Sequence, residues 1–166
     1  MLPTALHSDR ESAARTDDHR ALRLWLRLLT CTQLIERQVR ARLRSRFATT
    51  LPRFDLMSQL DRHPDGLKMN ELSRRMMVTG GNVTGIVDQL VKEGLVERAA
   101  HADRRAFRVR LTRAGERAFA EMARAHEEWV VEILAGLGRR EHAELFALLA
   151  KVKAHCLEVT ANEGSS

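Results

Sequence analysis

The sequence of 166 residues has little of what marks membrane, secreted or disulfide-rich proteins. It contains no run of about 18 apolar residues and no apolar signal segment near Met1, so we expect neither a membrane span nor secretion and place the chain in the cytoplasm. Its two cysteines, Cys31 and Cys156, lie far apart, which favours reduced thiols over a disulfide framework. A hydrophobic content of 44% suffices for the core of one ordinary domain.

The motifs of common enzymes are also absent. The sequence has no Gly-x-Ser-x-Gly elbow, no phosphate-binding Gly-rich loop and no His-Glu-x-x-His pattern. None of its seven histidines lies four residues from another, so a metal site would have to be assembled from separate elements. We therefore expect a protein that is not an enzyme and that holds neither a metal nor a cofactor.

The sequence does have positive charge, concentrated in two places within a net charge of +6. Residues 67–112 contain nine Lys/Arg against five Asp/Glu, and residues 20–47 contain eight Arg against Glu36 alone. The remainder of the chain is net acidic. Basic charge gathered in this way favours a polyanionic partner.

Residues 70–92 have the pattern of two short helices joined by a turn. Asn70 can cap a first helix in which Leu72 and Met76 share one face, and residues 77–79 are too few for anything but a turn. Thr79 is expected to cap the second helix. The apolar positions of that helix have the spacing i, i+3, i+4, i+7 and are Val83, Ile86, Val87 and Leu90.

The opposite face of the second helix carries small or hydrogen-bonding residues, namely Gly81, Asn82, Thr84, Gly85, Asp88 and Gln89. Such a face suits the major groove of DNA, where bases are recognised through donors and acceptors. Gly94 is the expected left-handed residue after the helix. Alternating residues then predict strands at 96–99 and 107–111, and Asp103, Arg104 and Arg105 lie at the hairpin tip, where they can reach a phosphate or a narrow minor groove. This order of elements is a winged helix-turn-helix and predicts binding to duplex DNA.

Long amphipathic patterns flank this head at residues 20–47, 114–137 and 141–159, the last two separated by Gly138. Helices this apolar need a cover that a lone winged domain does not provide, so we predict an intertwined two-fold dimer. The predicted fold is mainly α with a small β-wing, a winged helix-turn-helix head joined to long N- and C-terminal dimerisation helices. We expect a disordered segment at 1–19, the N-terminal helix at 20–48, the head at 49–112, the dimerisation helices at 113–160 and a flexible tail at 161–166.

A set of short motifs in fixed order resembles the MarR family of bacterial transcription regulators. The motifs are Glu71-Leu72-Ser73, Asn82-Val83-Thr84, Gly94-Leu95-Val96-Glu97-Arg98, Asp103-Arg104-Arg105 and Leu111-Thr112-Arg113-Ala114-Gly115. The resemblance extends over about residues 22–159 and implies a homodimer that binds a pseudo-palindromic operator, typically as a repressor. Gly85 departs from the family, which often has Arg there. The expected DNA contacts are Thr79, Gly81, Asn82, Thr84, Asp88, Gln89, Asp103, Arg104 and Arg105.

Arg37, Arg40 and Arg44 form a stripe on the first helix that has two interpretations. It can be a solvated face with some attraction to flanking DNA, or an anion site for an effector, because guanidinium groups suit carboxylates and phosphates. Residues 50–57 and 76–84 also resemble the branch of the family that controls breakdown of plant aromatic acids, which implies an aromatic acid or its hydroxycinnamoyl-CoA thioester as effector. The expected effector-binding residues are Trp25, Arg40, Arg44, Phe54, Met57 and Trp129.

Two alternatives stay open beside this prediction. The same fold can be triggered by a metal or by oxidation of Cys31, since some relatives sense peroxides through an early cysteine. That mechanism usually needs tyrosines near the thiolate, and this sequence has no Tyr, so we expect Cys31 to be a small buried hydrophobe. The other alternative is an architectural DNA-binding protein that responds to no ligand.

Overall fold

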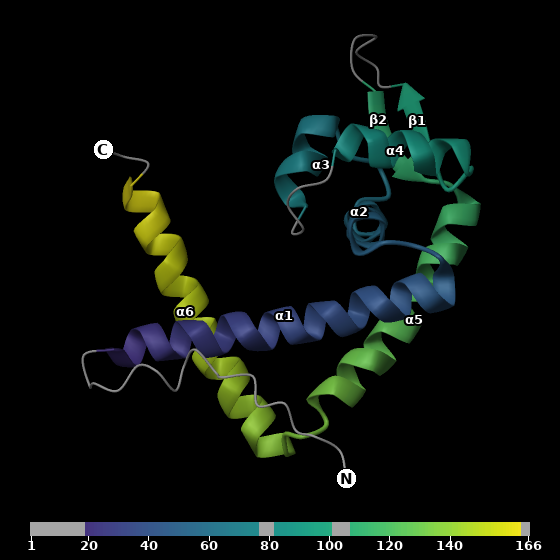
Figure 1. Ribbon diagram of the computed structural model, residues 1–166. Coiled ribbons are helices and arrows are strands. Elements are labelled where there is room, and N and C mark those ends of the chain that lie inside the picture. The colour runs from purple at the N-terminus through teal and green to yellow at the C-terminus, as the bar shows by residue number, and fades with distance from the viewer. Residues whose placement is uncertain (1–18, 77–81, 101–106, 164–166) are drawn as a thin grey trace. The chain divides into compact units, whose positions relative to one another are not determined.

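The computed structural model describes residues 19–76, 82–100 and 107–163. Within these ranges the chain forms helices α1 to α6 and strands β1 and β2 (Figure 1). Their bounds are α1 Arg20–Phe47, α2 Leu51–Asp61, α3 Met69–Arg75, α4 Val83–Lys92, β1 Val96–Ala100, β2 Phe107–Leu111, α5 Arg113–Leu134 and α6 Arg139–Glu163. The predicted class, mainly α with a small β-wing, is confirmed. The chain divides into two compact units, residues 1–127 and 128–166, which are described separately.

The first unit contains the winged-helix head. Its core is formed by apolar side chains with at most 1% of their surface exposed, which come from α1, α2, α3, α4 and the hairpin: Leu43, Leu56, Met57, Leu60, Leu72, Val87, Leu90 and Val109. Only the C-terminal part of α1 contributes, through Val39 and Leu43. Toward its other end, Leu22, Leu24 and Trp25 are exposed.

Both helices of the helix-turn-helix begin at other residues than predicted. The backbone N–H of Lys68 donates to Glu71 Oε2 at 3.0 Å, so α3 begins at Met69 and Asn70 lies inside its first turn instead of capping it. The N-cap of α4 is Asn82, whose Oδ1 accepts from the N–H of Gly85 at 3.1 Å, and the predicted cap at Thr79 is wrong. Gly80 and Gly81 disfavour helix, and Asn is as good a cap as Thr.

The turn from α4 into the wing matches the prediction closely. Gly94 has φ +71°, the left-handed conformation expected after a helix. Strands β1 and β2 pair antiparallel from Val96 opposite Leu111 to Ala100 opposite Phe107. The hydroxyl of Thr112 donates to the carbonyl of Gly94 at 2.6 Å, which fixes the end of the hairpin against this turn.

Gly115 lets α5 start directly against the same turn. A Cβ atom at this position would lie 1.9 Å from the carbonyl oxygen of Leu95, far inside the contact distance. The N–H of Gly115 donates to the hydroxyl of Thr112 at 3.1 Å. The first turn of α5 is therefore held to the wing at a distance that only glycine allows.

The second unit consists of the end of α5 and the whole of α6. Gly138 separates the two helices as predicted, and its N–H donates to Glu141 Oε2 at 2.7 Å. Every α6 residue whose side chain is described is exposed, including Phe146, Leu148 and Leu157. None of the described helices is long and apolar enough to span a membrane.

Candidate nucleic-acid interface

Helix α4 has one buried and one exposed face, as its sequence pattern predicts. Val87 and Leu90 are fully buried. Asn82, Thr84 and Gln89 are exposed, so three of the expected base-contacting side chains reach the surface of the head together. Other expected DNA contacts, Thr79, Gly81, Asp103, Arg104 and Arg105, lie outside the described residues.

Asn82 and Asp88 already have partners within the head. Because Asn82 Oδ1 accepts the capping hydrogen bond, its Nδ2 is the group left to donate to a ligand. Asp88 forms an ion pair with Arg98 of β1, and the guanidinium of Arg98 also lies 5.3 Å from the ring centroid of Phe107. The positive charge of Arg98 thereby compensates the carboxylate of Asp88, which lies on the same helix as Thr84 and Gln89. The Asp88 to Arg98 pair joins a helix to a strand, so helical periodicity does not reveal it.

The missing Arg at position 85 has a local explanation. A Cβ atom at Gly85 would lie 3.1 Å from Asn82 Nδ2 and 3.4 Å from its Cγ. A side chain there would press on the capping amide. Glycine at this position therefore accommodates the Asn82 cap that starts α4.

Two described arginines of the wing, Arg108 and Arg110, are held by hydrogen bonds within the head. Arg110 pairs with Glu97 across the hairpin, with Nε 2.6 Å from Oε1. Arg108 Nη1 donates to the carbonyl of Gly66 at 2.7 Å. The hydrogen bond from the Lys68 backbone lowers the pKa of Glu71, and the nearby guanidinium group of Arg108 lowers it further. The ionised form of Glu71 is therefore favoured.

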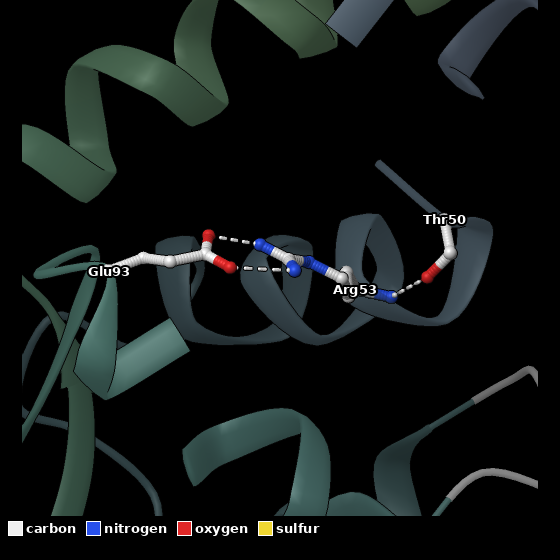
Figure 2. Close-up of polar contacts among 3 residues, drawn as sticks. All are labelled: Thr50, Arg53 and Glu93. Atoms are coloured by element: carbon white, nitrogen blue, oxygen red, sulfur yellow. Dashed lines mark hydrogen bonds and ion pairs between the residues drawn. The ribbon is translucent and has the colours of Figure 1, made fainter. Parts of the chain in front are cut away.

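An ion pair that the sequence did not indicate connects α2 with the end of α4 (Figure 2). Arg53 Nη1 lies 2.9 Å from Glu93 Oε1, and Arg53 Nη2 contacts Glu93 Oε2. The two residues are 40 positions apart. The pair therefore ties the C-terminal end of α4 to α2.

The expected effector residues of the first unit lie at separate hollows. Arg40 and Arg44 line a hollow of about 300 Å³ together with Leu51, Pro52 and Ile86. Phe54 lines a second hollow of about 440 Å³, with Leu51, Phe119 and His126. Leu51 borders both hollows. Met57 is buried and Trp25 is 57% exposed, and Trp129 is a buried residue of the second unit.

The ring of His126 packs against that of Phe54 in the larger hollow, tilted by 34° and with the ring centroids 4.9 Å apart. Burial lowers its pKa below the ordinary value of 6.5, so the neutral imidazole is favoured there. Asp55, Asp61 and Arg62 also line this hollow. The larger hollow therefore combines aromatic rings with two carboxylates and one guanidinium group, whereas the smaller one is lined by the two guanidinium groups of Arg40 and Arg44.

Comparison with known proteins decides the family. Residues 49–106 match the sequence model of the MarR family. The crystal structure of a MarR family transcriptional regulator from Silicibacter pomeroyi is 33% identical, with a TM-score of 0.74 over 86% of this chain and 99% of that one. The chain belongs to the MarR family. This is a family of DNA-binding transcription regulators and not of enzymes.

Other MarR-like proteins share the fold or part of the sequence. Wild-type MarR from E. coli is 26% identical, with a TM-score of 0.66 over 75% of this chain and 93% of that one. The HTH-type transcriptional regulator BilQ of Clostridium symbiosum is 31% identical over 88 residues, which make up 52% of this chain. The match spans 61% of BilQ.

The exposure of Cys31 differs from what the sequence of this MarR family member predicted. It is exposed on α1 in the single chain, so the expectation of a buried hydrophobe is wrong for the chain by itself. The core contacts of α1 begin only at Val39, further toward its C-terminus. Among the described residues, no three His, Cys, Asp or Glu side chains gather in a way that would hold a metal ion.

Proposed function

We propose that this MarR family member is a homodimeric repressor in the cytoplasm that leaves its operator when an aromatic anion binds. The observation that carries the proposal is the exposed face of α4, where Asn82, Thr84 and Gln89 stand over the buried Val87 and Leu90. A helix whose polar face is exposed and whose apolar face anchors it to a rigid head suits a major groove.

A second copy of the chain is the proposed cover for the exposed apolar side chains of the terminal helices. Leu22, Leu24, Trp25 and Leu34 are exposed on α1, and Phe146, Leu148 and Leu149 are exposed on α6. Apolar surface on this scale favours association. A two-fold dimer also presents two heads, so the operator would be an inverted repeat with half-sites about 10 base pairs apart, centre to centre.

DNA binding is tested with the full-length protein and a duplex selected from a randomised pool. We expect an inverted-repeat site, bound by a dimer, with affinity that falls steeply as salt rises. Arg104 and Arg105, with Asp103 orienting one of them, would act on phosphates or the minor groove, so Arg104→Ala should weaken binding to all duplexes. Gln89→Ala should instead change the preference among operator variants. Binding of a monomer to an asymmetric site would contradict the proposal.

The two hollows support an effector with an aromatic end and an anionic end. Phe54, Phe119 and His126 offer flat surfaces for a ring, and Arg40 and Arg44 offer charge for a carboxylate or phosphates. Both hollows border Leu51 and are therefore neighbours, so we propose that a hydroxycinnamoyl-CoA thioester occupies both. A free aromatic acid would fill one of them.

The position of Ile86 suggests how the effector acts on DNA binding. Ile86 belongs to α4 and lines the hollow that Arg40 and Arg44 border. A ligand there touches the recognition helix directly. The ligand releases the operator only if it binds more tightly to the conformation of the dimer in which the two heads do not fit successive major grooves.

The effector assignment is tested with Arg40→Ala combined with Arg44→Ala. This variant should lose most of the response to a hydroxycinnamoyl-CoA while keeping operator affinity within a few-fold. Arg23→Ala with Arg46→Ala removes the same charge from the same helix and should keep the response. Equal thioester affinity of the wild type and the Arg40/Arg44 variant in calorimetry would leave those arginines as a solvated face. No response to any aromatic acid or thioester would favour the architectural alternative.

The exposure of Cys31 favours oxidation as a second candidate trigger. In that case peroxide would release the operator from the wild type and not from Cys31→Ser. An identical peroxide response in both proteins would eliminate it.

A further inference from the structure

The Arg53 to Glu93 pair is not explained by the stability of either helix. Arg53 is the third residue of α2, close to the positive end of that helix dipole. Glu93 is the C-cap of α4, at the negative end. Each charge disfavours its own helix, since anions stabilise helix N-termini and cations stabilise C-termini. Only the contact between the two helices compensates for both charges.

The pair is also better formed than an ordinary surface ion pair. Both carboxylate oxygens meet the guanidinium group (Figure 2). The side chain of Arg53 is 18% exposed, and its Nε is buried without a hydrogen-bond partner among the described residues. A bidentate pair with one largely desolvated member is strongly directional. Loss of Glu93 would leave a partly buried cation without a carboxylate.

Glu93 is linked through the backbone to the elements that present α4. Its N–H donates to the carbonyl of Gln89 at 3.0 Å, and the N–H of Leu95 donates to that of Leu90 at 3.0 Å. The hydroxyl of Thr112 holds Gly94, the next residue. At the other end of the pair, the N–H of Arg53 donates to the capping hydroxyl of Thr50. The backbone at Glu93 is therefore coupled to α4 and to its turn into the wing.

We propose that Arg53 and Glu93 are positioning residues for operator recognition, which hold α4 at the angle that sequence-specific binding requires. This inference rests on the proposed function, in which α4 contacts the bases. Neither residue itself contacts DNA. The pair acts through the exposed side chains of α4, above all Thr84 and Gln89.

The substitution Glu93→Gln separates positioning from charge because the two effects have opposite signs. Removal of an acid from the head raises affinity for any duplex if charge alone matters. If Glu93 positions α4, affinity for the selected operator falls instead, by about tenfold or more, while affinity for a random duplex does not fall. Asp65→Asn, at an exposed acid between α2 and α3, is the matched control and should show only the charge effect.

Exchange of the two charges in one double variant tests the geometry without changing the net charge. Arg53→Glu and Glu93→Arg should each lose operator specificity, and the double variant should recover it to within a few-fold of the wild type, with thermal unfolding followed in parallel. The inference is wrong if Glu93→Gln behaves like Asp65→Asn, or if the double variant regains wild-type thermal stability without regaining specificity. If the wild type selects no operator, the proposed function fails first, whatever the variants do.

Discussion

The winged-helix head and α6 differ in where their apolar side chains lie. In the head, residues such as Leu43, Leu56 and Leu90 are completely buried within one chain. In α6, Phe146 is 78% exposed and Leu157 is 63% exposed. Both regions carry apolar residues at helical spacing, so the pattern alone does not say whether a helix is covered by its own chain.

This difference separates two uses of amphipathicity. The head closes its core around α4 with hydrogen bonds and ion pairs from α2 and the hairpin, which fix the exposed face. For α6, the apolar stripe is surface that burial against another chain would stabilise at roughly 25 cal/mol per Å².

Gly115→Ala should have the largest effect, because it forces a Cβ atom to 1.9 Å from the Leu95 carbonyl oxygen. The first turn of α5 and the turn before β1 would have to move apart, which should cost about 3 kcal/mol or more in the free energy of unfolding. Gly136→Ala is the matched control, since no described atom lies within 4 Å of a Cβ there. Urea unfolding that gives similar values for both variants would show that the head is not closed as described.

Leu148→Glu with Leu149→Glu should break the dimer and leave the head folded. The substitutions place charges on the apolar stripe of α6, and we expect the dimer dissociation constant to rise by about a hundredfold or more, measured by sedimentation. Ala147→Glu with Ala154→Glu adds the same charge on the opposite face of the helix and should leave the dimer intact. Equal dissociation of both double variants would contradict the assignment of this stripe.

Local patterns in the sequence were enough for most of the fold. Periodicity located α1 from Arg20 to Phe47 and the two faces of α4, and single glycines marked the ends at Gly94 and Gly138. Helix starts were less predictable. Several residue types can cap a helix, so the sequence pattern favours caps at Asn70 and Thr79, whereas the chain uses Lys68 and Asn82.

The contacts between elements were not predictable in the same way. Arg53 and Glu93 are separated by 40 positions, and Asp88 pairs with a residue on a strand. Such pairs depend on the angle at which elements pack, which helical spacing does not encode. For the same reason the sequence placed Phe54 with Arg40, whereas the structure divides them between two hollows that share Leu51.

Asn82→Ala should have a smaller effect on the head, because it removes one capping hydrogen bond. We expect a loss of about 1 kcal/mol in the free energy of unfolding. Asn82→Ser keeps a capping oxygen and should restore stability. If Nδ2 of Asn82 contacts a base, the Ser variant will still have altered operator preference in a selection from randomised duplexes. Wild-type preference in a stable Ser variant would limit Asn82 to its capping role.

The smallest effect is expected at His126, near the point along α5 where the first unit ends. Burial lowers the pKa of His126 from 6.5, so the unfolded chain binds more protons than the folded one between the two pKa values. The free energy of unfolding should therefore be highest above about pH 6.5 and decrease as the pH falls toward the folded pKa. The change should be less than about 1 kcal/mol, because the ring is only partly buried.

His126→Phe tests this dependence and keeps a ring against Phe54. The variant should have a flatter dependence of unfolding free energy on pH below 6.5, whereas His142→Gln, at an exposed position of α6, should keep the wild-type slope. Asp55, Asp61 and Arg62 line the same hollow and are unchanged in both variants, so the difference between the curves isolates His126. An unchanged slope in His126→Phe would mean that burial of this ring does not cause the pH dependence of the unfolding free energy below pH 6.5.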